Sequence, residues 1–240
     1  MRSDRIVGLD IFRGLALLLM IIYHFNFDLS YFHITEINLN KSQFFLLFRY
    51  TVISMFLLSM GISLSLVHKK SISWRKLKKR IFLLGLASLT VTTATYIIFP
   101  NSWIYFGILH FILLSSLLAL PFLNYPKVAF LFAILILIGF NTNYLTVHPI
   151  FNFIQPILNL PPIHTQDVIA IFPWFGVVLL GTVIAYYELH KIIFTKKIFN
   201  TNSKLNKILK FMGQNSLLIY LIHQPILFFA FESYFKFFSK

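Results

Sequence analysis

The chain has 240 residues, of which 58% are hydrophobic and 12% are charged, and its formal net charge is +14. Soluble domains carry about 25% charged residues. This composition therefore excludes a water-soluble globular domain, because the chain has too few charged residues to cover its surface. It favours a bilayer, in which one spanning helix needs roughly 20 apolar residues. Because there is no cysteine, disulfides and thiolate nucleophiles or metal ligands are also excluded.

Long apolar stretches occur seven times along the chain. They cover about residues 9–28, 44–67, 81–100, 103–122, 126–143, 168–187 and 213–235. Asp10 and Arg13 interrupt the first stretch and no small-residue cleavage site follows it, so we expect a retained helix and not a signal peptide. The sequence therefore predicts an all-α, polytopic transmembrane helix bundle of about seven spans, forming one domain over residues 1–240.

Basic residues are strongly partitioned between the connections. With seven spans, sixteen of the 21 lysines and arginines lie on one side of the membrane, most of them in 68–80 and 189–210. The positive-inside rule then places the N-terminus in the cytoplasm and the C-terminus outside. The net charge thus reports topology, and no nucleic-acid partner is expected.

Two connecting segments have patterns of their own. Segment 144–166 contains four prolines around short apolar runs, so we expect an outer cap or re-entrant piece. Segment 203–212 alternates lysine with leucine, isoleucine and phenylalanine, as an interfacial helix does.

One face of the first span carries four ionisable side chains, Asp10, Arg13, His24 and Asp28. At 100° per residue they share an arc of about 60° with Leu17. An ionisable side chain inside a span costs roughly 2.5–3.5 kcal/mol, so this face must point into the bundle or a water-filled cavity. An alternative stays open for Asp10 and Arg13, which are close enough to form an ion pair that only anchors the helix.

Further polar or aromatic candidates lie on the other spans. They are Arg49, His110, Asp167, Trp174, Tyr220 and His223. Asp167, Trp174 and Gly181 are spaced by sevens, which places them on one face of a helix. With a rise of 1.5 Å per residue in a core of about 30 Å, Arg49, His110 and His223 share one depth with His24 of the first span, roughly 18–22 Å above the cytoplasmic edge. We therefore predict that His24, His110 and His223 border one internal cavity.

A buried histidine beside a carboxylate has the chemistry of a general base. His24 with Asp28 one turn away can take a proton from a hydroxyl or amine before acyl transfer. Arg49 can stabilise developing negative charge. The same histidines are also compatible with a zinc site, although no two share a helix at ligand spacing, or with the proton relay of a small-solute transporter.

Four runs of the sequence carry a family resemblance. They are Leu9–Ala16 with Met20, His24 and Asp28; Tyr105–His110; Asp167 with Pro173–Gly176 and Gly181; and Gly213–Leu217 with Tyr220–Pro225. In this order they resemble the bacterial relatives of heparan-α-glucosaminide N-acetyltransferase over nearly the whole chain. The first run is also similar to that of the wider set of membrane acyltransferases that decorate bacterial envelope sugars.

The resemblance implies an enzyme of the bacterial cytoplasmic membrane that moves an acetyl group from cytoplasmic acetyl-CoA to a sugar outside. His24 would be the base and Asp28 its orienting group, whereas the essential histidine of the lysosomal members lies beyond the first span and makes His33 the alternative. The candidates on the other spans would line the substrate site. Asp10, Arg13, Lys79 and Arg80 would serve the acyl-CoA on the basic side, unless the lysines only follow the positive-inside rule or bind anionic lipid. No metal is expected.

Overall fold

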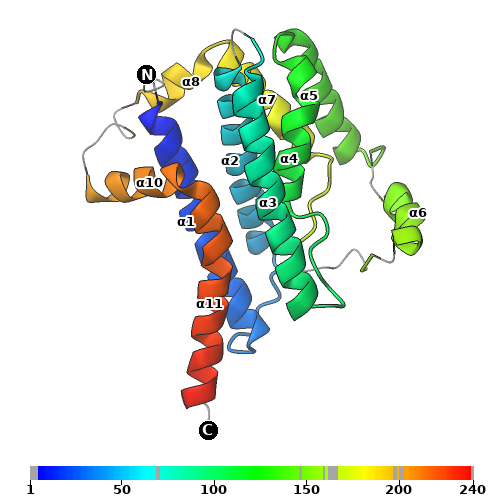
Figure 1. Ribbon diagram of the computed structural model, residues 1–240, viewed down its shortest axis with the longest axis vertical. Coiled ribbons are helices and arrows are strands. Elements are labelled where there is room, and N and C mark those ends of the chain that lie inside the picture. Colours follow the sequence, from blue (N-terminus) through cyan, green and yellow to red (C-terminus); the bar gives the residue numbers. More distant parts are fainter. Residues whose placement is uncertain are drawn as a thin grey trace. The chain divides into compact units, whose positions relative to one another are not determined.

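The computed structural model describes residues 5–68, 71–145, 148–158, 160–161, 167–196, 199 and 203–238. Within these ranges the chain contains helices and no strand, which confirms the predicted all-α class (Figure 1). Four of the helices are long and apolar enough to cross a membrane, judged by length and composition: α1 (Val7–Tyr31), α2 (Gln43–Val67), α3 (Trp74–Ile98) and α11 (Ser216–Phe238).

The other three predicted spans correspond to shorter apolar helices. These are α4 (Ile108–Leu118), which a 3-10 turn η1 (Leu120–Phe122) follows, α5 (Pro126–Asn141) and α7 (Trp174–Tyr186). With 11 and 13 residues, α4 and α7 fall short of the roughly 20 residues that cross a hydrocarbon core. The number of spans therefore stays a prediction.

The prediction that Asp167 shares a helix face with Trp174 and Gly181 is wrong. Residues 167–170 are irregular, and α7 begins only at Trp174. A proline disfavours helical backbone at the residue before it, so Pro173 keeps the helix from starting earlier. Trp174 and Gly181 do lie on α7, where both are buried.

Helices α6 (His148–Leu158), α8 (Leu189–Phe194) and α10 (Lys204–Gln214) also lie outside the apolar stretches. Helix α10 confirms that segment 203–212 is helical, and the Ser203 side chain caps it by accepting from the Asn206 amide at 3.2 Å. Helix α6 falls within segment 144–166, of which residues 146–147, 159 and 162–166 lie outside the described residues.

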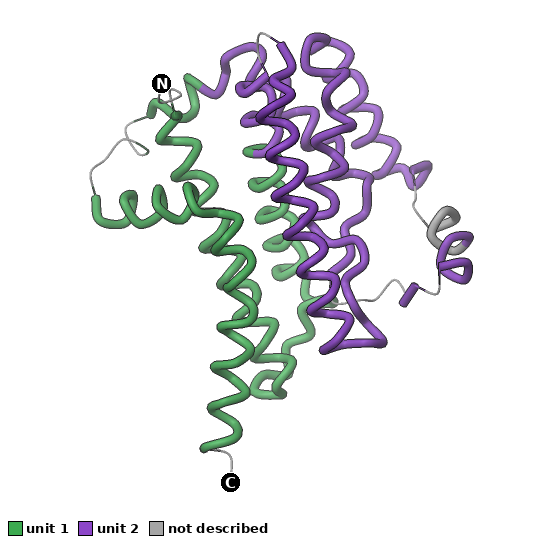
Figure 2. Tube along the Cα trace, viewed as in Figure 1, with its two compact units in different colours: residues 1–59, 191–240 green, residues 60–190 purple. Residues whose placement is uncertain are grey.

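The chain divides into two compact units (Figure 2). Unit 1 contains residues 1–59 and 191–240, so its described part comprises α1, most of α2, the end of α8, α10 and α11. Unit 2 contains residues 60–190, with the end of α2 and helices α3 to α7. The histidines predicted to converge are thereby split, because His24 and His223 belong to unit 1 and His110 belongs to unit 2.

In unit 1, α10 crosses α1 at backbone contact. A Cβ on Gly14 would collide with the Leu209 carbonyl, and one on Gly213 would collide with the Asp10 carbonyl. Only glycine lets the two backbones come this close. Further along α1, Leu17 and Met20 pack with Val52 of α2 in an apolar cluster.

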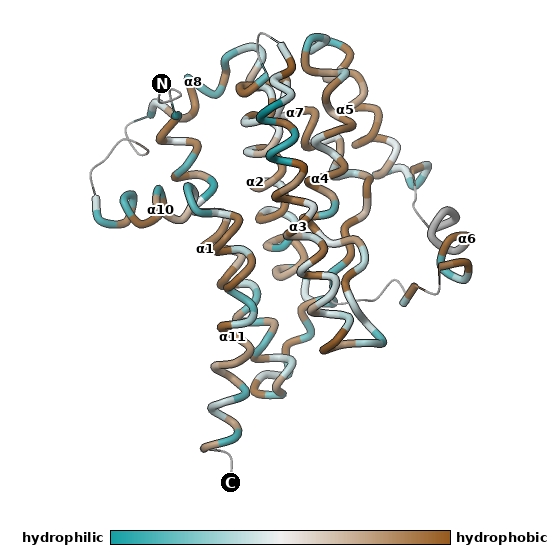
Figure 3. The backbone as a smooth tube through the Cα atoms, in the orientation of Figure 1, coloured by the Kyte–Doolittle hydropathy of each residue, from teal (hydrophilic) through white to brown (hydrophobic). Residues whose placement is uncertain are grey.

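In unit 2, glycines bring the helices close in a similar way. Gly61 near the end of α2 lies against the backbone of α7, and Gly176 of α7 lies against Ala133 of α5. Helix α3 carries apolar side chains that are exposed, such as Phe82 (69%) and Leu89 (62%), which is the pattern of side chains that face lipid. Figure 3 shows the hydrophilic first turns of α3 giving way to a hydrophobic helix.

Candidate functional site

Two histidines from different helices meet inside unit 1. The His24 ring of α1 and the His223 ring of α11 have centroids 4.9 Å apart, at an angle of 61°. His223 is buried and His24 is half-buried. The part of the predicted histidine layer that joins α1 to α11 is therefore present in the structure.

Hydrogen bonding fixes the tautomer of His223. Its Nδ1 lies 2.6 Å from the Tyr220 carbonyl oxygen, which can only accept, so Nδ1 carries the hydrogen. The neutral ring then keeps a lone pair on Nε2, which is buried and has no hydrogen-bond partner within the described chain. A ring held through one nitrogen with the other nitrogen unprotonated is the arrangement that a general base requires.

Asp28 bonds to α11 and not to His24. The Gln224 amide nitrogen donates to Asp28 Oδ1 at 2.8 Å, and no hydrogen bond joins Asp28 to His24 among the described residues. Asp28 is 0% exposed, so this bond holds the two helices together in an apolar surrounding. Since Gln224 follows His223 directly, the bond also fixes where His223 lies along α1.

Four buried polar atoms of this cluster have no hydrogen-bond partner among the residues that the structure describes: His24 Nδ1, Asp28 Oδ2, His223 Nε2 and Gln224 Oε1. The last three are acceptors when Asp28 is ionised, because Gln224 turns its NH₂ group toward Asp28 and Nδ1 of His223 holds the hydrogen. Buried acceptors without donors are costly. The histidine cluster therefore holds three acceptors without donors among the described residues.

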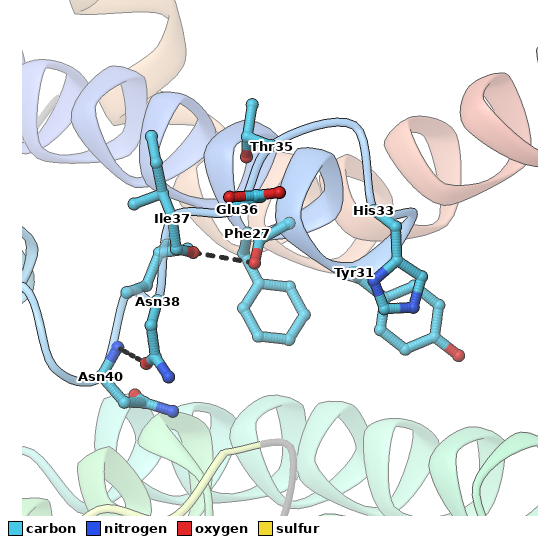
Figure 4. A pocket seen from close by; sticks show the side chains of 10 residues that line it. Phe27, Tyr31, His33, Thr35, Glu36, Ile37, Asn38 and Asn40 are labelled. Atoms are coloured by element: carbon cyan, nitrogen blue, oxygen red, sulfur yellow. Dashed lines mark hydrogen bonds between the residues drawn. The ribbon is translucent and has the colours of Figure 1, made fainter.

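A cavity of about 350 Å³ opens at the end of α1 and over the loop after it (Figure 4). Its lining comprises Phe27, Ser30, Tyr31, His33, Thr35, Glu36, Ile37, Asn38, Leu39 and Asn40. Phe27 joins this cavity to the histidine cluster, since its ring centroid lies 6.4 Å from that of His24. His33, the alternative catalytic histidine, is exposed on this loop with a φ of 57°.

Asp10 is the centre of a polar junction at the start of α1. Its carboxylate accepts from Arg5 at 2.9 Å, from Arg13 at 3.4 Å and from the Gln214 amide at 3.3 Å, while Arg13 also donates to the Gly213 carbonyl. Asp10 is 3% exposed. The predicted buried polar face of α1 is confirmed, and these bonds tie α1 to the α10–α11 corner. A part for Asp10 and Arg13 in donor binding stays a prediction.

His110 of unit 2 has a different surrounding. The Thr92 hydroxyl donates to the Ile104 carbonyl at 2.8 Å, so it accepts from His110 Nε2 at 3.1 Å. Thr92 thereby links α3 to the loop before α4 and to His110 of α4. Its Nδ1 is buried without a hydrogen-bond partner in the described ranges.

Asp167 caps α4. Its Oδ2 accepts from the Ile108 amide, one of the open donors of the first helical turn, at 3.2 Å. A Cβ at Gly107 would meet this oxygen at 2.8 Å, which explains the glycine that precedes Ile108. A structural role thus accounts for Asp167 without a substrate.

The remaining predicted site residues are spread over both units. Arg49 lies 3.5 Å from the Asn40 amide oxygen and over the Tyr50 ring, and the side chain of Tyr220 packs on the Leu17 cluster. In unit 2, Trp174 is buried at the start of α7, Lys79 is exposed, and Arg80 lines a second cavity.

Gln224 is the functional candidate that the sequence analysis missed. Its place between two histidine-bearing helices depends on how α11 is rotated about its axis. The available signals were its position beside His223 and its place in the run Tyr220–Pro225 that carries the family resemblance.

Comparison with known families gives one finding. The family described as heparan-alpha-glucosaminide N-acetyltransferase, catalytic, matches residues 5–225. Neither a curated protein nor a solved structure matches this chain. The matched range contains both histidines of the cluster, together with Asp28 and Gln224.

Proposed function

The chain belongs to the family of the heparan-alpha-glucosaminide N-acetyltransferase catalytic domain, and from this premise we propose a membrane acyltransferase. It moves an acetyl or other short acyl group from cytoplasmic acyl-CoA to a hydroxyl or amine of a sugar on the other side of a bacterial cytoplasmic membrane. The donor, the acceptor and the membrane are parts of this proposal.

The observation that carries the proposal is the set of unmatched acceptors around His24 and His223. A sugar hydroxyl or amine brings the hydrogen-bond donors that these atoms need. It also brings the proton that a general base must remove, which contributes about 10²–10⁴-fold to a rate.

The reaction needs one proton acceptor in this cluster. The acceptor oxygen or nitrogen attacks the thioester carbonyl carbon while its proton passes to a ring nitrogen of the pair. The carbon–sulfur bond then breaks, and the CoA thiolate takes the proton and leaves as the thiol. His223 Nε2 has the lone pair and the fixed ring, and His24 lies against it, so we assign the proton to the pair.

Asp28 is a positioning residue in this mechanism. It acts through Gln224, because it has no hydrogen bond to His24 in the described part of the chain. Its charge also stabilises an imidazolium formed nearby.

The cavity at the end of α1 suits a sugar. Phe27 and Tyr31 offer apolar ring surface, and Glu36, Asn38 and His33 offer polar groups. Its volume of about 350 Å³ lies at the lower end of the range of ligand pockets, roughly 300–1,000 Å³. We assign this cavity to the acceptor, which gives His33 a binding role.

The orientation follows from the charge partition. We propose that the N-terminus and the start of α3 are cytoplasmic and that the acceptor cavity faces outward. Reporter fusions after residues 75, 155 and 200 should read inside, outside and inside. A cytoplasmic signal at 155 would mean that α5 does not cross the membrane, and it would contradict the proposed outer position of segment 144–166.

The function is tested with purified protein in nanodiscs, labelled acetyl-CoA and a panel of neutral and amino sugars. We expect labelled sugar and free CoA in equal amounts, and a loss of at least about 100-fold in kcat/KM in His24→Ala. The matched control is Asn26→Ala on the same helix, where the Asn26 amide bonds only to its own helix at Ile22. A transporter would neither bind nor cleave acetyl-CoA, and that result would end the proposal.

His33→Ala separates the two histidine assignments. If His33 binds the acceptor, KM for the sugar rises and kcat is largely kept. A loss of kcat with unchanged KM would make His33 the base and would exclude His24.

A further inference from the structure

A second cavity, of about 140 Å³, lies where α2 ends and α3 begins, within unit 2. Its lining comprises Ser63, Leu64, Val67, His68, Lys76 and Arg80. Among the described residues that line it, none is acidic. The acyl-transfer chemistry proposed above uses none of these side chains.

His68 is a buried donor in this cavity. It is 3% exposed, and its Nδ1 accepts from the Ser73 amide at 3.0 Å. A ring nitrogen that accepts carries no hydrogen, so the neutral ring has its hydrogen on Nε2. The His68 ring makes no other hydrogen bond to the described residues, so its Nε2–H has no acceptor among them.

Two cations stand beside this imidazole. Arg80 is anchored by a bond from its Nε to the Ser116 hydroxyl at 3.0 Å, and Lys76 lies one turn earlier on α3. Burial lowers the pKa of His68, and the charges of Arg80 and Lys76 lower it further. The imidazole thus remains neutral in a positive potential.

We propose that this cavity binds one phosphate group, held by His68 Nε2–H, the Lys76 ammonium and the Arg80 guanidinium. All three groups only donate hydrogen bonds, and a phosphate oxygen only accepts them. The volume is less than half of the roughly 300 Å³ at which ligand pockets begin. It therefore has room for one phosphate with a few waters and not for a nucleotide.

The phosphate has two possible sources with the same chemistry: a phosphomonoester of the acyl donor, or the headgroup of an anionic lipid. The first source rests on the proposed function and would anchor the nucleotide end of CoA outside the reaction centre. The phosphate site itself stands on the geometry of unit 2 alone.

Binding is measured by calorimetry on the whole protein in phosphatidylcholine nanodiscs. The probes are inorganic phosphate, CoA and 3′-dephospho-CoA, and a second set of nanodiscs contains phosphatidate. Lys76→Gln is the principal variant because Lys76 is exposed and its replacement should leave the fold intact. Lys78→Gln removes the same charge from the same helix but lies outside the cavity lining, which makes it the matched control.

We expect Lys76→Gln and His68→Asn to weaken phosphate binding about tenfold each and Lys78→Gln to leave it unchanged. CoA binding more tightly than its dephospho form, with this preference lost in Lys76→Gln, identifies the donor. Equal binding of the two, with inorganic phosphate displaced by phosphatidate, identifies the lipid.

Inorganic phosphate that does not bind, or binds equally to wild type and Lys76→Gln, overturns the proposal. The two proposals fail separately. Phosphate binding without acyl transfer removes only the enzymatic function, and acyl transfer with phosphate binding insensitive to Lys76 removes only the phosphate site.

Discussion

The two units both bury a histidine, but they treat its hydrogen bonds differently. In unit 2, His110 Nε2 is joined through Thr92 to the Ile104 carbonyl, its Nδ1 has no partner in the described chain, and Asp167 caps α4, the helix that carries His110. In unit 1, His24 and His223 face each other among acceptors that lack donors in the described chain. Buried polar atoms without a partner in the described chain also occur in unit 2, at Ser88 of α3 and His110 of α4, but in unit 1 four of them gather around one histidine pair.

This difference separates structural from functional polarity inside a membrane protein. An ionisable residue in a span is costly in either unit, so its mere presence does not reveal its purpose. What distinguishes the cluster of unit 1 is that four unsatisfied groups from two helices gather at one place. The following predictions test that distinction, beginning with the largest effect.

Removing either histidine of the pair should cost about 10²–10⁴-fold in kcat/KM, because each change disrupts the same proton acceptor. The kcat/KM of the double variant His24→Ala/His223→Ala should be close to that of the less active single variant, since the effects of residues that act as a unit are non-additive. His110→Ala should lose less than about tenfold. Steady-state kinetics on all four proteins decide the matter, and an equal loss in His110→Ala would erase the contrast between the units.

Gly213→Ala should destabilise unit 1 by about 1–3 kcal/mol or more, because the new methyl group meets the Asp10 carbonyl, which cannot change rotamer. The control is Gly85→Ala in α3, where the nearest atom, of Leu113, lies 4.0 Å from the added carbon. That change should be neutral or stabilising, since alanine favours helix. Thermal unfolding in detergent measures both. If Gly213→Ala is as stable as the wild type, helices α1 and α10 can move apart enough to accommodate the methyl group.

Asp28→Ala and Gln224→Ala should be coupled. In a double-mutant cycle on stability we expect an interaction energy of about 1–2 kcal/mol, as for buried partners of one hydrogen bond. Asn26 with Gln224 serves as the uncoupled pair. Additive effects of Asp28 and Gln224 would mean that the bond between α1 and α11 contributes nothing.

Thr92→Val should have the smallest effect, about 1 kcal/mol of stability, because it removes one acceptor for His110 and one donor to Ile104. Activity per folded molecule should be unchanged. A fall in kcat with normal stability would move His110 from the structural to the catalytic group.

Hydropathy was sufficient to find every apolar helix, and the period of 3.6 residues was sufficient to predict the buried face of α1. Depth along the spans correctly brought His24 to His223. These inferences work because they depend on distances along one helix, which the sequence contains directly.

The errors and omissions all concern how one segment meets another. Asp167 was placed on a helix that Pro173 prevents from starting so early, and its bond to the Ile108 amide requires the chain to fold back over 59 positions. The bond from Gln224 to Asp28 depends on the rotation of α11. Neither the return of the chain from Asp167 to Ile108 nor the rotation of α11 leaves a periodic pattern in a single sequence.

The make-up of unit 1 has a consequence for biosynthesis. The bond between Asp28 and Gln224 joins positions 196 residues apart, and the residues between them are largely those of unit 2. A ribosome thus delivers α1 to the membrane long before α11 exists, and during that interval the acidic and imidazole groups of α1 have no partner from α11. Until the last helix docks, α1 carries a polar face that lipid disfavours, which makes it a natural client for an insertion chaperone. Chains that stop before α11 would keep this polar face of α1 uncovered. The exposed face alone would then be sufficient for membrane-protein quality control to recognise them.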